Sequence, residues 1–534
     1  AGVGRAAGKV ACNELVDDLL AEIVRTIEDK IVHAEAVRHA ARVLHIVKRA
    51  AGVRAVIARI GDAYGCLLLR SREITDGKAS AAGQIRMTLL YIAEGTKELR
   101  SFEYSLPLSC TFDGRTGEDA VDSCLEGRLC APEIRKLNPR KILTRASVEL
   151  TLSPYAPCAL TMCSGVEDQA AYQIETLCEK REIPMIRGIR EKEFTFADEV
   201  LLSSTKEPIR ELLRTRCALR VTDCKEIGNK LVLKGLALFE ALYLDVGGNI
   251  AQASSELPFS QILDGLAEED ANASVRSSLR LTGAEIRIGS ESEPDNDRLI
   301  SLKLSISAFA VLSERRSVCC IADLYSTSCE LSAKTENVEF SGEPASFMCE
   351  QIVREKIETG AEVQSVLSTD ISFCNAGVSL NGTAAELRAA ATLRVLYLDE
   401  NNAPLLSERR TEVSLRTDLP DAPLGRVGVR DVCAGDISVS IGADGVELRF
   451  PVQFTLSVAE TPCYPCLTSL QAEKRVEESA ELPSIILRAV KQGERLWDIA
   501  KQYRTTVDTI LAANELAEES AALAGKLLLI PRRR

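Results

Sequence analysis

The sequence predicts a mainly β protein: three tandem β-rich repeats, each with one short helix, followed by a small β-α-α-β domain. Three observations lead to this prediction. A Leu-Tyr pattern recurs at nearly constant spacing, apolar and polar residues alternate over long stretches, and helical spacing appears near the carboxyl end. Alternation with a period of two is typical of a half-buried strand, whereas apolar residues three and four positions apart indicate a helix.

Three segments that end in leucine, tyrosine and an apolar residue define the repeats. Their tyrosines are 152 and 154 residues apart, at Tyr91, Tyr243 and Tyr397. A polar turn and a second alternating segment follow each of them, which predicts a hairpin. The tyrosines lie on the apolar side of the alternation, so we interpret them as core residues whose hydroxyl groups reach the edge of the core.

Two further segments recur around each hairpin. Short runs with helical spacing precede it, and we predict one short helix in each repeat, at 36–44, 207–213 and 361–367. Long alternating segments follow it and predict the strands that close the repeats, at 140–153, 297–310 and 445–458. Because the order is the same in three copies, the sequence predicts a tandem repeat.

These segments divide the chain into five parts. Repeat 1, with a helical amino-terminal segment, takes residues 1–178, and repeat 2 takes residues 179–343. Repeat 3 takes residues 344–470. A linker rich in Glu and Ala, residues 471–483, then leads to the last domain, residues 484–534.

Composition and charge restrict the classes of function. The 534 residues are 46% hydrophobic and 27% charged, which is a globular composition. The formal net charge of −13 argues against nucleic-acid binding, which needs a basic face. No run reaches the roughly 18 apolar residues of a membrane helix, and acidic residues interrupt the amino-terminal segment too early for a secretory signal. We therefore expect a cytoplasmic protein without membrane insertion.

The cysteines do not predict a redox or metal site. Most of the 18 stand among apolar positions, so we interpret them as small buried side chains. Cys463 and Cys466 have redox spacing, but no βαβ pattern surrounds them, and we prefer a strand-end turn at Pro465. Cys319 and Cys320 are adjacent in a predicted strand and should face opposite sides of it.

No motif of an enzyme or cofactor site is present. The sequence lacks glycine-rich phosphate loops, the H-E-x-x-H zinc pattern and the G-x-S-x-G elbow. The only histidines, His33, His39 and His45, are six residues apart and cannot share one helix face. We place them on a surface or partly packed helix within the Ala-rich segment 13–60. The sequence therefore predicts a non-enzymatic protein with no metal and no cofactor.

The last domain contains the only tryptophan of the chain, Trp497. A short strand at 484–492, a turn at Gly493, two helical runs and a final strand give the order β-α-α-β. Thr505 or Thr506 suits the cap of the second helix. We interpret Trp497 as a core residue of this small domain, and stacking on a ligand is the alternative. One face of the first helix should carry Leu496, Ile499, Ala500 and Tyr503.

This domain resembles the LysM family. The matching positions are Val490, Gly493, Leu496, Trp497, Ile499, Ala500, Thr505, Thr506, Val507, Asn514, Leu527, Leu529, Ile530 and Pro531. The resemblance implies a shallow groove for peptidoglycan or chitin between two loops, which here are Gly493, Glu494, Arg495 and Leu496, and Leu523, Ala524, Gly525 and Lys526. The rim departs from the family pattern, because Glu494-Arg495 replaces Asp-Thr and Ala524 replaces Pro.

The three repeats resemble the SPOCS domain of clostridial spore-coat proteins. The Leu-Tyr hairpins and the segments 138–150 and 322–328 carry this resemblance. Tandem SPOCS domains followed by one LysM domain imply a scaffold made in the mother-cell cytoplasm that docks at the forespore surface. There its LysM domain would bind the coat-basement ATPase, a protein partner. Exposed β edges would also favour self-association.

Two functions remain open after the sequence analysis. The preferred one is a non-enzymatic spore-coat scaffold that binds other proteins through its LysM and SPOCS domains. The alternative is a wall protein that binds peptidoglycan or another polymer of N-acetylglucosamine.

Overall fold

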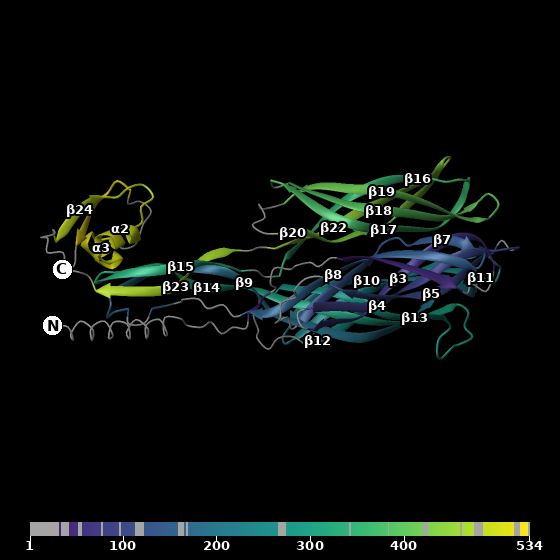
Figure 1. The fold of residues 1–534 in the computed structure, drawn as a ribbon, viewed down its shortest axis with the longest axis horizontal. Helices are drawn as coiled ribbons and strands as arrows, with labels where there is room; N and C mark the ends of the chain where they lie inside the picture. The colour runs from purple at the N-terminus through teal and green to yellow at the C-terminus, as the bar shows by residue number, and fades with distance from the viewer. Residues whose placement is uncertain are drawn as a thin grey trace.

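The computed structural model of the chain is elongated (Figure 1). Three β-rich units gather at one end, an arm of strands leaves them, and a small domain with two helices lies at the tip of the arm. Of residues 31–33, 42–51, 157–158 and 474 only the backbone is described. The described residues are 31–33, 42–51, 56–75, 78–95, 98–112, 122–158, 165–166, 169–264, 274–340, 343–382, 384–419, 426–459, 462–474, 484–516 and 524–531.

Each repeat folds into two facing β-sheets. One sheet is a meander of three strands, and the other is centred on one strand, the closing strand of the repeat, that pairs with its other strands. The apolar faces of the two sheets meet in a core cluster. In repeat 1 the meander is β3 (Ile57–Thr75), β4 (Lys78–Ala93) and β5 (Leu99–Thr111), and the second sheet is β2 (Arg42–Ala51), β6 (Asp122–Leu129), β7 (Glu133–Asn138) and β8 (Lys141–Cys158).

Repeats 2 and 3 follow the same order, except that repeat 2 has one described strand between its meander and its closing strand where repeats 1 and 3 have two. Repeat 2 has the meander β10 (Ile209–Ile227), β11 (Lys230–Asp245) and β12 (Ile250–Asp264), faced by β9 (Ile174–Leu201), β13 (Ser274–Ile288) and β14 (Leu299–Ser326). Repeat 3 has β17 (Val363–Asn381), β18 (Ala384–Asp399) and β19 (Pro404–Asp418), faced by β16 (Ala345–Glu358), β20 (Val427–Ala434), β21 (Ser438–Gly442) and β22 (Gly445–Val458). A short strand, β1 (Ile31–His33), pairs with both β8 and β9.

The predicted hairpins and closing strands are present in all three repeats. The hairpins are β4–β5, β11–β12 and β18–β19, and the closing strands are β8, β14 and β22. The tyrosine of each Leu-Tyr pair is buried in the core of its own repeat, as the alternation predicts: Tyr91, Tyr243 and Tyr397.

The short helices predicted in repeats 2 and 3 are wrong, because residues 209–213 and 363–367 form strands. Of the helix predicted in repeat 1, residues 42–44 form a strand as well, and residues 36–41 fall outside the described residues. In repeat 2 the segment lies at the start of β10, and the pairing of β10 with β11 shifts register near Ile209 and again near Leu212. Each extra residue of such a bulge displaces the following side chain, so Ile209, Leu212 and Leu213 acquire helix-like spacing in a strand. The start of β17 has two such shifts as well.

The helical interpretation of segment 13–60 is also wrong where the structure describes it. Residues 42–51 form β2 and β3 begins at Ile57. His33 and His45 lie in the strands β1 and β2, and His39 falls outside the described residues. The alanines of this segment have high helix propensity, but strand pairing with β8 overrides that local preference.

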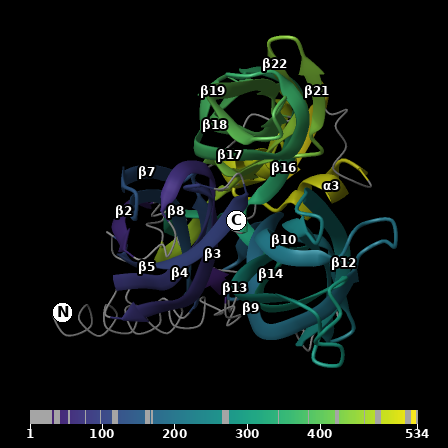
Figure 2. The same ribbon diagram turned by 90° about the vertical axis from the view of Figure 1, so that its right-hand side faces the viewer.

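The three repeats surround a common centre, which we call the hub (Figure 2). The meander sheets supply its apolar side chains, including the leucine of every Leu-Tyr pair. Neighbouring residues of a strand face opposite sides, so the tyrosine enters its own repeat while the leucine enters the hub. The buried apolar residues of the hub are Leu90, Ile92, Leu99, Leu213, Leu242, Leu244, Leu367 and Leu396.

Polar side chains at equivalent positions of the repeats also meet in the hub. Asp62, Arg214 and Ser368 are separated by 152 and 154 residues, the spacing of the tyrosines. The guanidinium of Arg214 donates to Asp62 Oδ2 at 3.0 Å and with its other nitrogen to Ser368 Oγ. Tyr64, Arg216 and Asp370 each follow two positions later and also meet. Arg216 Nη1 lies 2.8 Å from Asp370 Oδ1, and the guanidinium lies over the ring of Tyr64. At both sets of equivalent positions, the hub therefore joins three unlike side chains, one from each repeat.

The arm consists of two antiparallel ribbons. Residues 174–186 of β9 pair with residues 313–326 of β14, and β15 (Cys329–Glu339) pairs with β23 (Cys463–Lys474). The ribbons combine residues 174–178 of the range predicted for repeat 1, both ends of the range predicted for repeat 2 and the end of the range predicted for repeat 3. Strand β23 also includes the first residues of the predicted linker. Buried side chains hold the ribbons together: Ile183, Met185, Cys320, Phe340 and Cys466.

The cysteines differ in part from their interpretation as buried apolar residues. Only 4 of the 13 free cysteines that the structure describes are buried. The predicted turn at Pro465 is wrong, because that residue lies within the paired strand β23. Cys319 is exposed and Cys320 is buried, in agreement with the predicted opposite faces. A disulfide, Cys130–Cys374, joins repeats 1 and 3 and was not expected from the sequence.

Candidate functional site

The domain at the tip of the arm has the predicted order of elements. Its two strands, β24 (Ile485–Ala489) and β25 (Leu527–Pro531), pair antiparallel, and the helices α2 (Leu496–Tyr503) and α3 (Val507–Ala513) lie between them in sequence. Thr506 caps α3, because its Oγ1 accepts the N–H of Thr509 at 3.1 Å. The core contains Val490, Leu496, Ile499, Ala500, Ile510, Leu528 and Ile530.

Asn514 connects the helices to the final strand. Its Nδ2 donates to the carbonyl of Leu529 at 2.7 Å, and its Oδ1 accepts the N–H of Leu529 at 2.8 Å. The second N–H of the amide donates to the carbonyl of Ile510 in α3, also at 2.7 Å. One side chain thus fixes β25 against the end of α3, which positions the loop that precedes β25.

The two loops that should form the groove lie side by side. The N–H of Gly525 donates to the carbonyl of Val490 at 2.8 Å, and the N–H of Val490 donates to the carbonyl of Lys526 at 3.0 Å. Gly493 and Gly525 both have φ near +80°, where glycine is favoured, and a Cβ on either would meet no atom within 4 Å. Both glycines therefore border open space.

The two loops are accessible and charged. Gly493, Arg495, Ala524, Gly525 and Lys526 are exposed, whereas Leu496 is buried beneath them in the core. Leu523 falls outside the described residues. The structure therefore brings seven of the eight predicted residues to one end of the domain: Gly493, Glu494, Arg495, Leu496, Ala524, Gly525 and Lys526.

Glu494 and Arg495, which depart from the LysM pattern, are both held in place. The carboxylate of Glu494 accepts the Arg488 guanidinium at 2.5 Å and the N–H of Lys491 at 3.1 Å, which closes the turn before α2. Arg495 is the N-cap residue of α2 but makes no side-chain cap bond. It instead donates twice to Asp498, at 3.1 and 3.0 Å. The hydrogen bond from Arg495 lowers the pKa of Asp498.

Trp497 has a role that sequence reasoning missed. Its side chain is only 6% exposed and is part of the core, as predicted. Its Nε1–H, however, donates to Asp323 of the arm at 2.7 Å, and its ring lies 4.9 Å from that of Tyr325, edge to face. Tyr325 Oη in turn donates to the carbonyl of Thr505 at 2.8 Å. The tryptophan therefore belongs both to the domain core and to the contact with the arm.

Asp323 is the centre of that contact. Its second carboxylate oxygen accepts Lys501 Nζ at 2.6 Å. Partial burial raises the pKa of Asp323, but the hydrogen bonds from Lys501 and Trp497 outweigh burial, and the net pKa is lowered. No periodic pattern in the sequence links position 323 with positions 497 and 501, so this contact was not predictable from it.

A pocket of about 290 Å³ lies beside the junction of arm and domain. Its walls include the paired charges Asp323 and Lys501, and also Glu330 and Arg504, whose charged atoms are 3.6 Å apart. These charges satisfy one another across the junction. The pocket adjoins the carboxyl half of α2, whereas the groove loops precede α2 and β25.

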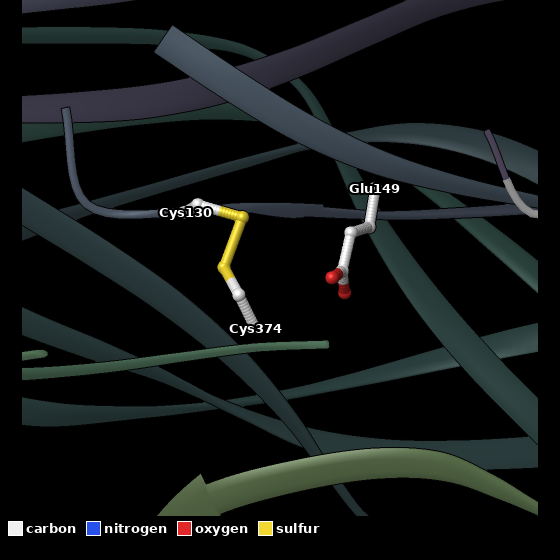
Figure 3. Close-up of side chains that lie close together, drawn as sticks. All are labelled: Cys130, Glu149 and Cys374. Carbon is white, nitrogen blue, oxygen red and sulfur yellow. A yellow bond between two sulfur atoms is a disulfide. The ribbon is translucent and has the colours of Figure 1, made fainter. Parts of the chain in front are cut away.

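One group of side chains could hold a metal ion among the residues that the structure describes. It consists of Cys130, Glu149 and Cys374, far from the groove and between repeats 1 and 3. Figure 3 shows the two cysteines joined as a disulfide with the Glu149 carboxylate beside them. No metal site was expected from the sequence, where nothing sets these three residues apart.

Comparison with known proteins identifies the small domain. Residues 489–531 match the family model of the LysM domain. No curated protein and no solved structure matches the chain. The match includes both groove loops and both helices, so a LysM domain is present at the tip of the arm. No helix among the described residues is long and apolar enough to cross a membrane.

Proposed function

We propose that the protein binds peptidoglycan or another polymer of N-acetylglucosamine through its LysM domain. The observation that carries this proposal is the pair of adjoining, exposed loops at one end of the domain, which are the loops that form the ligand groove in the LysM family. The arm contacts α2 and the connection between the helices, through Trp497, Lys501 and Thr505. Docking on the arm therefore leaves Gly493 and Gly525 exposed.

The proposed role is binding without catalysis. The three repeats use their equivalent polar positions to pair with one another in the hub, as Asp62, Arg214 and Ser368 do. Such buried networks hold repeats in a fixed arrangement. The three repeats and the arm would then act as a rigid support that presents the LysM domain to an insoluble polymer.

The disulfide Cys130–Cys374 supports an oxidising location, outside the cytoplasm. Disulfides persist in secreted and surface proteins and are rare in the cytosol, where thiols are kept reduced. Peptidoglycan lies outside the cytosol as well. The proposed ligand thus lies in the proposed location. That location differs from the cytoplasmic one expected from the sequence.

A sedimentation assay with insoluble peptidoglycan and chitin tests the proposal. The full chain should sediment with at least one polymer, and Gly493→Val and Gly525→Val should abolish sedimentation because they fill the groove. Gly248→Val is the matched control: Gly248 has φ near +85° and equally open surroundings but lies in a turn of repeat 2. Equal sedimentation of all three variants, or none of the wild type, would contradict the proposal.

The second candidate is a SipL-like spore-coat scaffold with SPOCS repeats. The observation that favours it is the threefold recurrence of one sandwich with equivalent hub residues, which suits a structural support. In this case the groove would bind the coat-basement ATPase at the forespore surface, in the mother-cell cytoplasm. Retention of that ATPase by the full chain, lost in Gly493→Val while neither glycan sediments with the wild type, would favour this candidate.

A further inference from the structure

Repeats 1 and 3 meet along a seam that is rich in specific contacts. Arg430 of repeat 3 pairs with Glu126 of repeat 1 at 2.8 Å, and Arg410 pairs with Glu133 at 3.0 Å. Arg128 of repeat 1 likewise pairs with Asp431. These ion pairs join the two repeats in addition to the disulfide. The seam therefore holds its side chains in a defined geometry.

Three of these side chains carry metal-ligating atoms. Cys130 follows β6, Glu149 belongs to β8, and Cys374 lies in β17 beside a bulge. The two sulfur atoms and one carboxylate oxygen all lie within 4.8 Å of one another, and each residue is half-buried (Figure 3). The N–H of Asn375, which has a left-handed backbone, donates to Glu149 Oε1 at 2.6 Å. That hydrogen bond aims the carboxylate at the cysteines.

We propose that the reduced form of Cys130 and Cys374, together with Glu149, binds one thiophilic divalent ion such as Zn²⁺. Zinc binds thiolates at about 2.3 Å and carboxylates at about 2.0–2.2 Å, in tetrahedral sites. Two sulfurs on one zinc ion stand about 3.8 Å apart, so the two side chains must separate once the disulfide is reduced. A water molecule would complete the fourth position, because the cluster is partly open to solvent.

Cys130 and Cys374 would thus join repeats 1 and 3 in two ways, by a disulfide or by a shared metal ion. A dithiol or phosphine reductant cleaves the disulfide: the sulfur–sulfur bond takes two electrons and two protons, and the reductant is oxidised. Zn²⁺ then displaces the two thiol protons, which leave to solvent, and no further electrons move. Repeats 1 and 3 stay joined through the metal in the reduced protein and through the disulfide in the oxidised protein. This inference is independent of what the LysM groove binds.

A zinc titration of the full chain against a chromophoric chelator tests the proposal. The chain is first reduced with a phosphine, and the tightly bound zinc is counted for wild type and variants. Cys374→Ser should bind one equivalent less than wild type, while Cys433→Ser, which removes an exposed free cysteine, should bind as much as wild type. Equal binding by wild type and Cys374→Ser would overturn the proposal.

Glu149→Gln separates the metal site from the folding of the seam. This variant keeps both cysteines, so oxidised protein should still contain the Cys130–Cys374 disulfide, detected by mass spectrometry of peptides. After reduction its zinc affinity should fall at least about tenfold, since even outer-shell partners of metal ligands are worth that much. An unchanged zinc affinity of the reduced Glu149→Gln variant would show that Glu149 is not a ligand. Zinc binding by oxidised wild type at the same stoichiometry would show that the metal binds elsewhere, and would contradict the proposal.

Discussion

The body of three repeats and the LysM domain use a large ring for different purposes. In the three repeats, Tyr91, Tyr243 and Tyr397 each fill the core of their own repeat, and the neighbouring leucines and unlike polar residues make the contacts in the hub. In the LysM domain, Trp497 both fills the core and contacts another part of the molecule, because its indole N–H donates to Asp323 of the arm. A small domain has few buried side chains, so one residue has to serve two contacts.

The comparison also explains why the repeats have diverged at polar positions. Around a common centre, equivalent residues approach one another, and identical charges there would repel. Asp62, Arg214 and Ser368 avoid this, because an acid, a base and a hydroxyl satisfy each other. Apolar residues carry no such conflict, and the three leucines of the Leu-Tyr pairs have stayed the same: Leu90, Leu242 and Leu396.

The largest effect is expected from removing the base at the hub. Arg214→Ala leaves Asp62 buried with one charge partner fewer, which should reduce the free energy of unfolding by about 3–5 kcal/mol. Urea unfolding followed by far-ultraviolet circular dichroism measures this. Arg220→Ala, on the exposed part of the same strand, should change it by less than about 0.5 kcal/mol. Similar effects of both substitutions would mean that the polar hub does not stabilise the body.

A smaller effect is expected at the junction of arm and LysM domain. Asp323→Asn weakens the charge-assisted hydrogen bonds from Trp497 and Lys501, at a cost of about 1.5–3 kcal/mol of docking energy. Because Trp497 is the only tryptophan, its emission reports this contact alone and should shift to longer wavelength. Glu330→Gln, which removes a more exposed charge pair at 3.6 Å, should leave the emission unchanged.

Acid should weaken the same contact in wild-type protein. The pKa of Asp323 is lower in the docked state than its ordinary value of 3.8, so the charged carboxylate stabilises docking above that value. This contribution disappears as the pH falls through the docked pKa. The emission of Trp497 should therefore stay constant from pH 7 to about 5 and then shift below about pH 4. Asp323→Asn should lack this transition, and its persistence in that variant would assign it to another group.

The smallest effect is expected from Tyr243→Phe. The Tyr243 ring is fully buried, but its hydroxyl has no hydrogen-bond partner among the residues that the structure describes. Removing this hydroxyl should change the free energy of unfolding by no more than about 1 kcal/mol, since no hydrogen bond is lost. Loss of more than that in urea unfolding would show that the hydroxyl has a partner and that the core depends on it.

The sequence by itself determined the strands, the hairpins and the LysM domain. The strands β4, β11 and β18 could be predicted from the alternation of apolar and polar residues, because successive side chains of a strand face opposite sides. The LysM domain could be predicted because its motif lies within one short segment, from Val490 to Pro531. The same local reasoning failed at β10 and β17, where bulges give strand residues the spacing of a helix.

Only the tertiary structure decided what the exposed and polar positions do. The groove loops could be predicted because both belong to one short motif, although Leu523 lies outside the described residues. The hub, the contact of Asp323 with Trp497 and the cluster of Cys130, Glu149 and Cys374 join residues more than a hundred positions apart. Such contacts leave no periodic signal along the chain, because they depend on how complete sheets pack and not on the pattern within any one strand.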